Sequence, residues 1–207
     1  PMSLPDVLKF LPPQCKQRIS KYIPAYGRLL NFLGFPPGNI TDDVFFDTHV
    51  SHGNLEIIKH SELAKHVWHY ATSMLAASYG HLHLLKWARS QDPPLEWGKS
   101  TCEMAAMDGR LEILKWVRSQ DPPCPWDEWT CVSAAMDGRL EILKWALSQD
   151  PPCRFDVDAC TEAARYGHLH VLQWLVEQGY EWDTDDCREA ARLNCRTKIV
   201  EWIDAVV

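Results

Sequence analysis

Residues 105–116 read Ala-Ala-Met-Asp-Gly-Arg-Leu-Glu-Ile-Leu-Lys-Trp, and this stretch decides the fold because the chain repeats it. The same order of an alanine pair, a glycine, two leucine-type positions and a tryptophan returns at residues 76–87, 134–145 and 163–174. The glycine recurs every 29 residues, as Gly80, Gly109, Gly138 and Gly167. A fixed period between about 20 and 50 residues is typical of a repeat array. The pattern therefore predicts a solenoid in which each unit packs on its neighbours.

Each unit carries the pattern of two short helices. Ser100 is a residue type that favours the N-cap, and residues 101–107 are predicted to form about two turns of a first helix. This helix is expected to end at Gly109, because glycine accepts a left-handed conformation. Residues 111–117 have an apolar face at helical spacing. Asp121-Pro122-Pro123 stops this second helix because proline cannot continue it. A unit is therefore expected to be helix, turn, helix and loop.

Two further copies lie at the edges of the array. Gly53 precedes Gly80 by 27 residues, and Asn194 follows Gly167 by 27 residues. Asparagine commonly replaces glycine in the left-handed conformation, so Asn194 is expected to end the first helix of the C-terminal unit. The array is thus predicted to hold about six units over residues 41–207. Residues 2–40 lack the repeat and are predicted to form an N-terminal helical cap, because the end of a solenoid core must be covered.

The repeated phrase resembles the ankyrin repeat, most closely in Gly80-His81-Leu82 and Gly167-His168-Leu169. It is similar to the short, Trp- and Cys-rich ankyrin-like repeats of large DNA viruses, oomycetes and algae. The period of 27 or 29 residues is shorter than the roughly 33 of the family, and the missing residues fall where the family has its β-hairpin. The resemblance implies an all-α fold, an α-solenoid of helix–turn–helix ankyrin-like repeats with shortened or absent β-hairpins. It also implies that the two histidines are structural.

Composition and charge restrict the function classes. A hydrophobic fraction of 46% is sufficient for a core, and a net charge of −7 disfavours broad contact with a nucleic-acid backbone. No apolar run approaches the roughly 18 residues of a membrane span, and no secretory signal pattern is present. These features predict an intracellular protein of a reducing compartment, the cytoplasm or the nucleus, with neither nucleic acid nor membrane as its partner.

The eight cysteines favour core packing over disulfides. Four of them stand three residues before the first alanine of an Ala-Ala pair, so they are expected to form a buried ladder: Cys102, Cys131, Cys160 and Cys187. The others are expected to be free thiols, namely Cys15, Cys124, Cys153 and Cys195. No Cys-x-x-Cys pair has the spacing of a zinc site, so no metal is expected.

Catalytic motifs are also missing from the sequence. It contains neither the Gly-x-Ser-x-Gly elbow of a serine hydrolase nor the glycine-rich lysine loop that binds nucleotide phosphates. The chain is therefore predicted not to be an enzyme and to need no cofactor.

The aromatic residues fall into two periodic rows and one exception. The row in the second helices is expected in the core: Trp87, Trp116, Trp145, Trp174 and Trp202. The row in the loops is expected to bridge adjacent units, or alternatively to form a half-exposed binding row: Trp68, Trp97, Trp126, Phe155 and Trp182. Trp129 is the exception, because it stands at the position of Ser100, Asp158 and Asp185, which are good N-cap residues. Asp127 or Thr130 is expected to cap instead, and Trp129 is either partly packed or an exposed anchor for a partner.

In the ankyrin family the first helix of each unit lines the concave face. Carried over by position, the resemblance implies a partner-binding surface that includes Glu103, Met107, Asp108, Glu128, Trp129, Met136, Asp137, Arg165, Tyr166 and Arg192. Val132 is expected near the same face. This surface changes from acidic and methionine-bearing to basic toward the C-terminal end, which favours a protein segment of mixed charge; the alternative is a solvated face without a partner.

Two functions are compatible with these patterns. The first is a non-catalytic scaffold that binds a protein partner on the concave face. The second is a substrate receptor of a cullin ubiquitin ligase, because residues 4–33 resemble a shortened F-box that opens with Leu4-Pro5 and reaches Leu11-Pro12. In that case the N-terminal segment would bind the ligase adaptor. Packing of Leu4, Leu8 and Leu11 onto the first unit would favour the cap instead.

Overall fold

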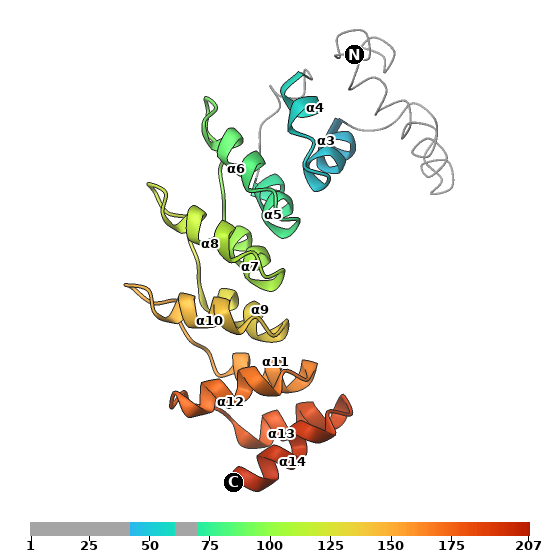
Figure 1. Cartoon of the computed structure of the whole chain (residues 1–207), viewed down its shortest axis with the longest axis vertical. Helices are drawn as coiled ribbons and strands as arrows, with labels where there is room; N and C mark the ends of the chain where they lie inside the picture. The colour runs from blue at the N-terminus through green and yellow to red at the C-terminus, as the bar shows by residue number, and fades with distance from the viewer. Residues whose placement is uncertain (1–41, 61–69) are drawn as a thin grey trace, which may run out of the picture.

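The computed structural model describes residues 42–60 and 70–207, which form a row of helix pairs (Figure 1). The first helices of the pairs are α3 (Asp42–Ser51), α5 (Tyr70–Ser78), α7 (Lys99–Met107), α9 (Glu128–Met136), α11 (Asp158–Tyr166) and α13 (Thr184–Leu193). The second helices are α4 (Leu55–His60), α6 (Leu82–Arg89), α8 (Leu111–Arg118), α10 (Leu140–Leu147), α12 (Leu169–Glu177) and α14 (Thr197–Val206). No strand occurs in these described ranges, and the predicted all-α solenoid is confirmed. The N-terminal cap predicted for residues 2–40 lies outside the described residues, and so does Trp68.

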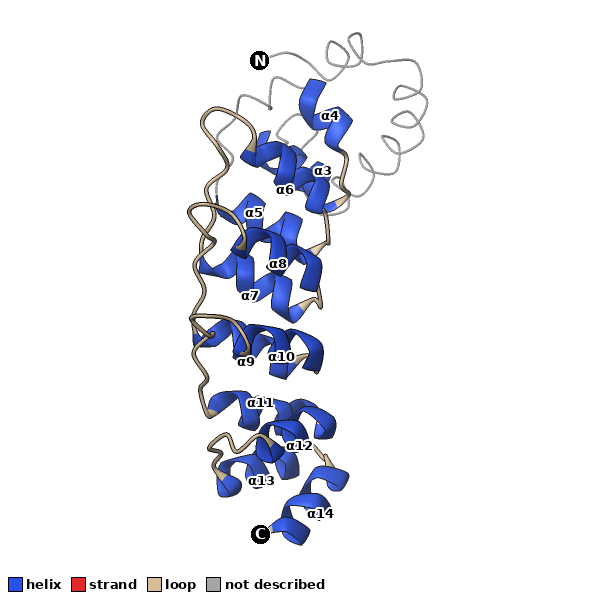
Figure 2. Ribbon diagram, turned by 60° about the vertical axis from the view of Figure 1, so that its left-hand side comes forward, coloured by secondary structure: helices blue, strands red, loops and turns tan. Residues whose placement is uncertain are grey.

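The first helices form a continuous inner layer. Helices α5, α7, α9, α11 and α13 each pack directly on the next, whereas neighbouring second helices make far fewer contacts with one another. A layer with closer spacing lies on the inside of a curve, and the array bends so that its first helices face the hollow side (Figure 1). The connecting loops project together from one side of the array (Figure 2).

The core repeats with the sequence. One leucine of each central second helix is fully buried, and so is the cysteine ladder: Leu85, Leu114, Leu143 and Leu172, then Cys102, Cys131, Cys160 and Cys187. Burial raises the pKa of the Cys160 thiol to about 12 and that of Cys187 to about 11, so both stay protonated at neutral pH. The prediction of a buried, unpaired ladder is confirmed. Cys124 and Cys153 are also free and buried, while Cys195 is exposed.

From the second unit onward, the side chain after the left-handed turn residue links its unit to the preceding one. Where this residue is arginine its Nε donates to a backbone carbonyl at the end of the preceding first helix, as Arg110 does to Ser78 at 2.9 Å. Where it is histidine the ring does the same, as His81 Nε2 does to Ser51 O at 2.9 Å. The other links join Arg139 to Met107, His168 to Met136 and Arg196 to Arg165. The structural role expected for His81 and His168 is confirmed, and this contact secures each interface.

The loop aromatics fill the space between neighbouring second helices. The Arg89 guanidinium on α6 lies 4.3 Å from the centre of the Trp97 ring, whose edge meets Trp116 on α8 with centroids 5.9 Å apart. Trp126 stands in the same way between Arg118, at 4.0 Å, and Trp145. These residues are half-buried against the core, so the prediction that they bridge units is confirmed. The tryptophans of the second helices also pack on the core but keep one edge in solvent.

Two predictions about helix ends are wrong. Ser100, Asp158 and Asp185 do not cap their helices, because each lies inside the first turn. The capping carboxylates stand two residues earlier, in Asp127, Asp156 and Asp183, whose side chains accept hydrogen bonds from backbone N–H groups of the first turn.

The second error concerns Asn194. Its φ is −106°, and the left-handed residue is Cys195 with a φ of 56°. Helix α13 has 10 residues where α11 has 9, so the turn moves by one position. Counting from the alanine pair alone did not detect this extra residue.

Candidate functional site

The predicted site residues lie at two ends of the first helices. Helices α7, α9 and α11 run side by side, so equivalent positions form rows across the array (Figure 1). Glu128 and Trp129 lie in the first turn of α9, near the connecting loop, and Glu103 lies in the middle of the neighbouring α7, where the charge of Asp127 acts on its carboxyl group. The remaining residues of the set lie near the turns that end the first helices: Met107, Asp108, Met136, Asp137, Arg165, Tyr166 and Arg192. All ten are at least partly exposed. We call the first group the loop-end patch and the second the turn-end patch.

The loop-end patch is built around the carboxylate of Asp127. Asp127 Oδ1 accepts a hydrogen bond from the Trp129 backbone N–H at 3.1 Å, and its Oδ2 lies 2.8 Å from Lys99 Nζ on the preceding unit. This confirms Asp127 as the cap of α9. Because the carboxylate fixes the first turn, the Trp129 side chain is placed outward and is 52% exposed.

Electrostatics distinguish the charged groups of the loop-end patch. Burial raises the pKa of Glu103 above its usual value, and the negative charge of Asp127 raises it further. The hydrogen bond to Asp127 raises the pKa of Lys99, and the charges of Asp127, Glu128 and Glu103 add to this effect. The Lys99 ammonium therefore interacts electrostatically with three carboxylates, which come from two neighbouring units.

The turn-end patch combines ion pairs with exposed apolar groups. Asp108 accepts a hydrogen bond from Ser78 Oγ at 2.6 Å, and Arg165 Nε lies 3.2 Å from Glu162 on the same helix. Asp137 pairs with Arg139. Tyr166 is 47% exposed. These acids are thus already engaged within the array, and the tyrosine ring is the larger free surface.

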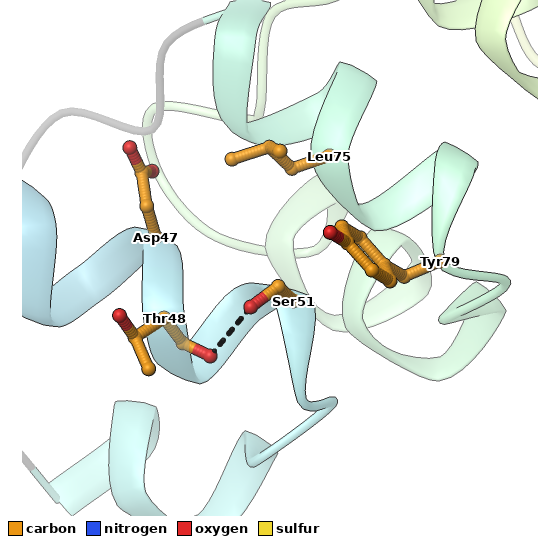
Figure 3. A pocket seen from close by; sticks show the side chains of 5 residues that line it. All are labelled: Asp47, Thr48, Ser51, Leu75 and Tyr79. Atoms are coloured by element: carbon orange, nitrogen blue, oxygen red, sulfur yellow. Dashed lines mark hydrogen bonds between the residues drawn. The ribbon is translucent and has the colours of Figure 1, made fainter. Parts of the chain in front are cut away.

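The sequence interpretation missed Tyr79, which is 53% exposed and stands one residue before the turn glycine, as Asp108 and Tyr166 do. It borders an open depression of about 320 Å³ between α3 and α5, whose other lining residues are Asp47, Thr48, Ser51 and Leu75 (Figure 3). The position before each turn glycine varies from unit to unit, and that variation was the available signal. Leu193 is also strongly exposed at the end of α13.

The prediction that Val132 lies near the concave face is wrong. Val132 is only 2% exposed, because it belongs to the core between neighbouring first helices. On α9 the buried Val132 therefore separates Trp129 from Met136, whereas the equivalent position on α7 is the partly exposed Glu103.

The described residues also hold no group of three or more His, Cys, Asp or Glu side chains placed to hold a metal ion. Among the helices of this part of the chain, none is both long and apolar enough to span a membrane.

Comparison with known proteins finds ankyrin repeats in one segment of the array. Residues 131–176, which run from α9 to α12, match the family model described as ankyrin repeats (many copies). No curated protein matches the chain. Ankyrin repeats are protein–protein interaction modules and are in general not catalytic. The helix pairs on both sides of the matched segment share its turns and its inter-unit links, so the described array is similar to ankyrin repeats beyond the matched residues as well.

Proposed function

We propose that this protein is a non-catalytic scaffold that holds a protein partner on the surface of its first helices. The exposure of Trp129 is the observation that carries this proposal. In the described part of the chain, the tryptophans of the second helices and loops pack against the core, whereas Trp129 presents about half of its surface to solvent. Exposed tryptophan is a favoured anchor at protein interfaces, where a few such residues supply most of the binding energy.

The architecture supports such a role because it fixes the positions of side chains on neighbouring helices. The links from His81, Arg110 and Arg139 hold successive units together, so the loop-end and turn-end patches are presented at set spacings. Because the surface is already ordered, the scaffold loses less conformational entropy when it binds a partner. The mixture of exposed aromatic, methionine and charged side chains suits a protein segment.

Site-specific photo-cross-linking in cell lysate tests the proposal. A benzophenone amino acid replaces Trp129 in one variant and Glu112, an exposed residue of α8 on the outer helix layer, in the control variant. We expect a defined set of proteins to be linked through position 129 and not through position 112. Identical proteins from both positions, or none from position 129, would contradict the proposal.

The hypothesis of a ubiquitin-ligase receptor concerns residues 4–33, which lie outside the described residues. Leu4-Pro5 and Leu11-Pro12 are the sequence features that favour it. Binding of purified ligase adaptor to the full chain, and not to a chain lacking residues 2–40, would support it. Absence of adaptor binding to the full chain would leave the scaffold function alone.

A further inference from the structure

The loop-end patch carries more negative than positive charge beside an exposed indole. Glu103 on α7 and Asp127 and Glu128 at the start of α9 surround the single ammonium of Lys99. On the next unit Asp158 occupies the position equivalent to Trp129 and is exposed. The first turn of α11 carries Asp158 and that of α13 carries Asp185 and Asp186, of which Asp185 pairs with Arg188 at 2.7 Å, so acidic groups recur along the array.

The three carboxylates differ in how far their oxygens are already engaged by groups of the chain. Both oxygens of Asp127 are engaged, one by the Trp129 N–H and the other by Lys99. The nearest cation to Glu128 is Arg154, whose NH1 lies 3.8 Å from Glu128 Oε2 and whose side chain is 83% exposed. That pair is long and solvated, so it contributes little. Glu103 takes a hydrogen bond from Ser100 but is held in a site where burial and Asp127 oppose its charge.

Trp129 is 52% exposed, so part of its side chain is accessible to a ligand. Elsewhere in the chain two tryptophans carry an arginine guanidinium over the ring, Arg89 over Trp97 and Arg118 over Trp126. Within the described residues no cation of the chain lies over Trp129. An indole face attracts cations, and adjacent carboxylates strengthen that attraction.

We propose that Trp129, Glu103 and Glu128 form a docking site for an arginine side chain carried by a basic segment of a protein partner. The planar guanidinium stacks on the indole while its N–H groups donate to the glutamates, a combination that the ammonium of lysine does not match in geometry. Further basic residues of the segment follow the acidic first turns of α11 and α13. This inference rests on the proposed scaffold function and specifies the chemistry of its partner.

A selection with a random dodecapeptide library displayed on phage tests the inference on the full chain. We expect the enriched peptides to contain arginine flanked by other basic residues. Their affinity, measured by fluorescence anisotropy with labelled synthetic peptides, falls at least tenfold in Trp129→Ala and in the double variant Glu103→Gln, Glu128→Gln. The double variant also lowers the dependence of affinity on salt, because fewer charges are neutralised on binding.

A matched double variant supplies the control. Glu112→Gln with Glu141→Gln removes two charges from exposed glutamates of α8 and α10, and binding is expected to stay within twofold of the native chain. Circular dichroism and thermal unfolding establish that each variant is folded. A lysine analogue of the best peptide, with each arginine replaced, is expected to bind several-fold more weakly.

The outcomes separate the inference from the function on which it rests. Selected peptides that need Trp129 but lack basic residues would overturn the arginine site and leave the scaffold function standing. Failure to enrich any arginine-bearing peptide, or binding that ignores Trp129, would overturn the inference too. The cross-linking experiment at position 129 decides the scaffold function independently.

Discussion

At the residue scale, each turn glycine meets a conformational and a steric requirement together. Gly109 has a φ of +75° and Gly138 a φ of +70°, a region that costs other residues roughly 1–2 kcal/mol. A Cβ added to Gly109 would lie 3.2 Å from Arg139 Nε, while one added to Gly138 would lie 2.6 Å from His168 Nδ1. The guanidinium chain is flexible, whereas the imidazole ring is rigid and bound to the preceding unit.

The two alanine variants are therefore expected to differ. Gly109→Ala should lower the free energy of unfolding by about 1–2 kcal/mol, the cost of the left-handed conformation. Gly138→Ala should cost more, because the ring of His168 must also move. Urea denaturation of both variants measures the difference, and an equal loss in the two would show that the steric contact is relieved without cost.

His49 on α3 is expected to make the stability of the array sensitive to acid. Burial lowers the pKa of its imidazole to about 4, with a contribution from the charge of His52. In the unfolded chain the value is about 6.5, so the unfolded state binds a proton first as the pH falls. The stability is fully present above about pH 6.5 and decreases toward pH 4, by on the order of 3 kcal/mol.

The variant His49→Gln tests this expectation. Glutamine does not titrate, so the difference in unfolding free energy between pH 7 and pH 4.5 should be smaller than in the native chain. Urea titrations at the two pH values provide the comparison. A variant whose stability changes with pH as steeply as the native chain would contradict the role of His49.

At the element scale, the start of α9 depends on one side chain with two tasks. Asp127 caps the helix through Oδ1 and joins α7 through its ion pair with Lys99. Asp127→Ala removes both contacts and should cost about 1 kcal/mol, a typical value for a lost N-cap. Asp127→Asn keeps a capping oxygen and should cost less, since a solvated ion pair contributes about 0–1 kcal/mol. Thermal unfolding of the two variants checks the order, and an equal loss in both would assign the effect to the ion pair.

The elements that repeat are those that the sequence predicted best. The spacing of Gly80, Gly109 and Gly138 predicted where each helix pair has its turn, because a glycine with positive φ returns at the same place in each unit. The cap positions of α11 and α13 were misplaced by two residues, since Asp156 and Asp158, like Asp183 and Asp185, are the same residue type and composition does not choose between them. The shift from Asn194 to Cys195 was not predictable from spacing, because a single added residue in a helix leaves the apolar pattern almost unchanged.

The candidate site was predicted less completely than the fold. Trp129 was singled out because it departs from its own repeat and Tyr166 because of its position on the concave face of the family, and both are exposed. Val132 was misplaced because a helix in the middle of an array is covered on two sides, which a single helix pattern does not reveal. The division into a loop-end and a turn-end patch depends on packing between units and emerges only in three dimensions.

At the scale of the whole molecule, each unit contacts only its neighbours, so stability is a sum of units and interfaces. Ile203 belongs to α14, the last helix, whereas Leu143 lies in α10 between two neighbours, and both are fully buried. Replacement of either by alanine should cost about 2–5 kcal/mol locally. Ile203→Ala should therefore release α13 and α14 while the central units stay folded.

Hydrogen exchange read by mass spectrometry distinguishes these responses. Ile203→Ala is expected to accelerate exchange in residues 184–206 and to leave α7 to α10 protected. Leu143→Ala is expected to accelerate exchange in α9 to α12, on both sides of the substitution. Uniform acceleration along the chain in Ile203→Ala would contradict a nearest-neighbour array and indicate all-or-none unfolding.

The unequal packing of the two helix layers gives the molecule a direction of mechanical compliance. First helices abut one another directly, whereas Trp97 and Trp126 stand between the second helices as separate spacers. We therefore expect the array to bend more easily in its outer layer of second helices than in its inner layer, so that the exposed side chains of the first helices keep their mutual spacing when the curvature changes.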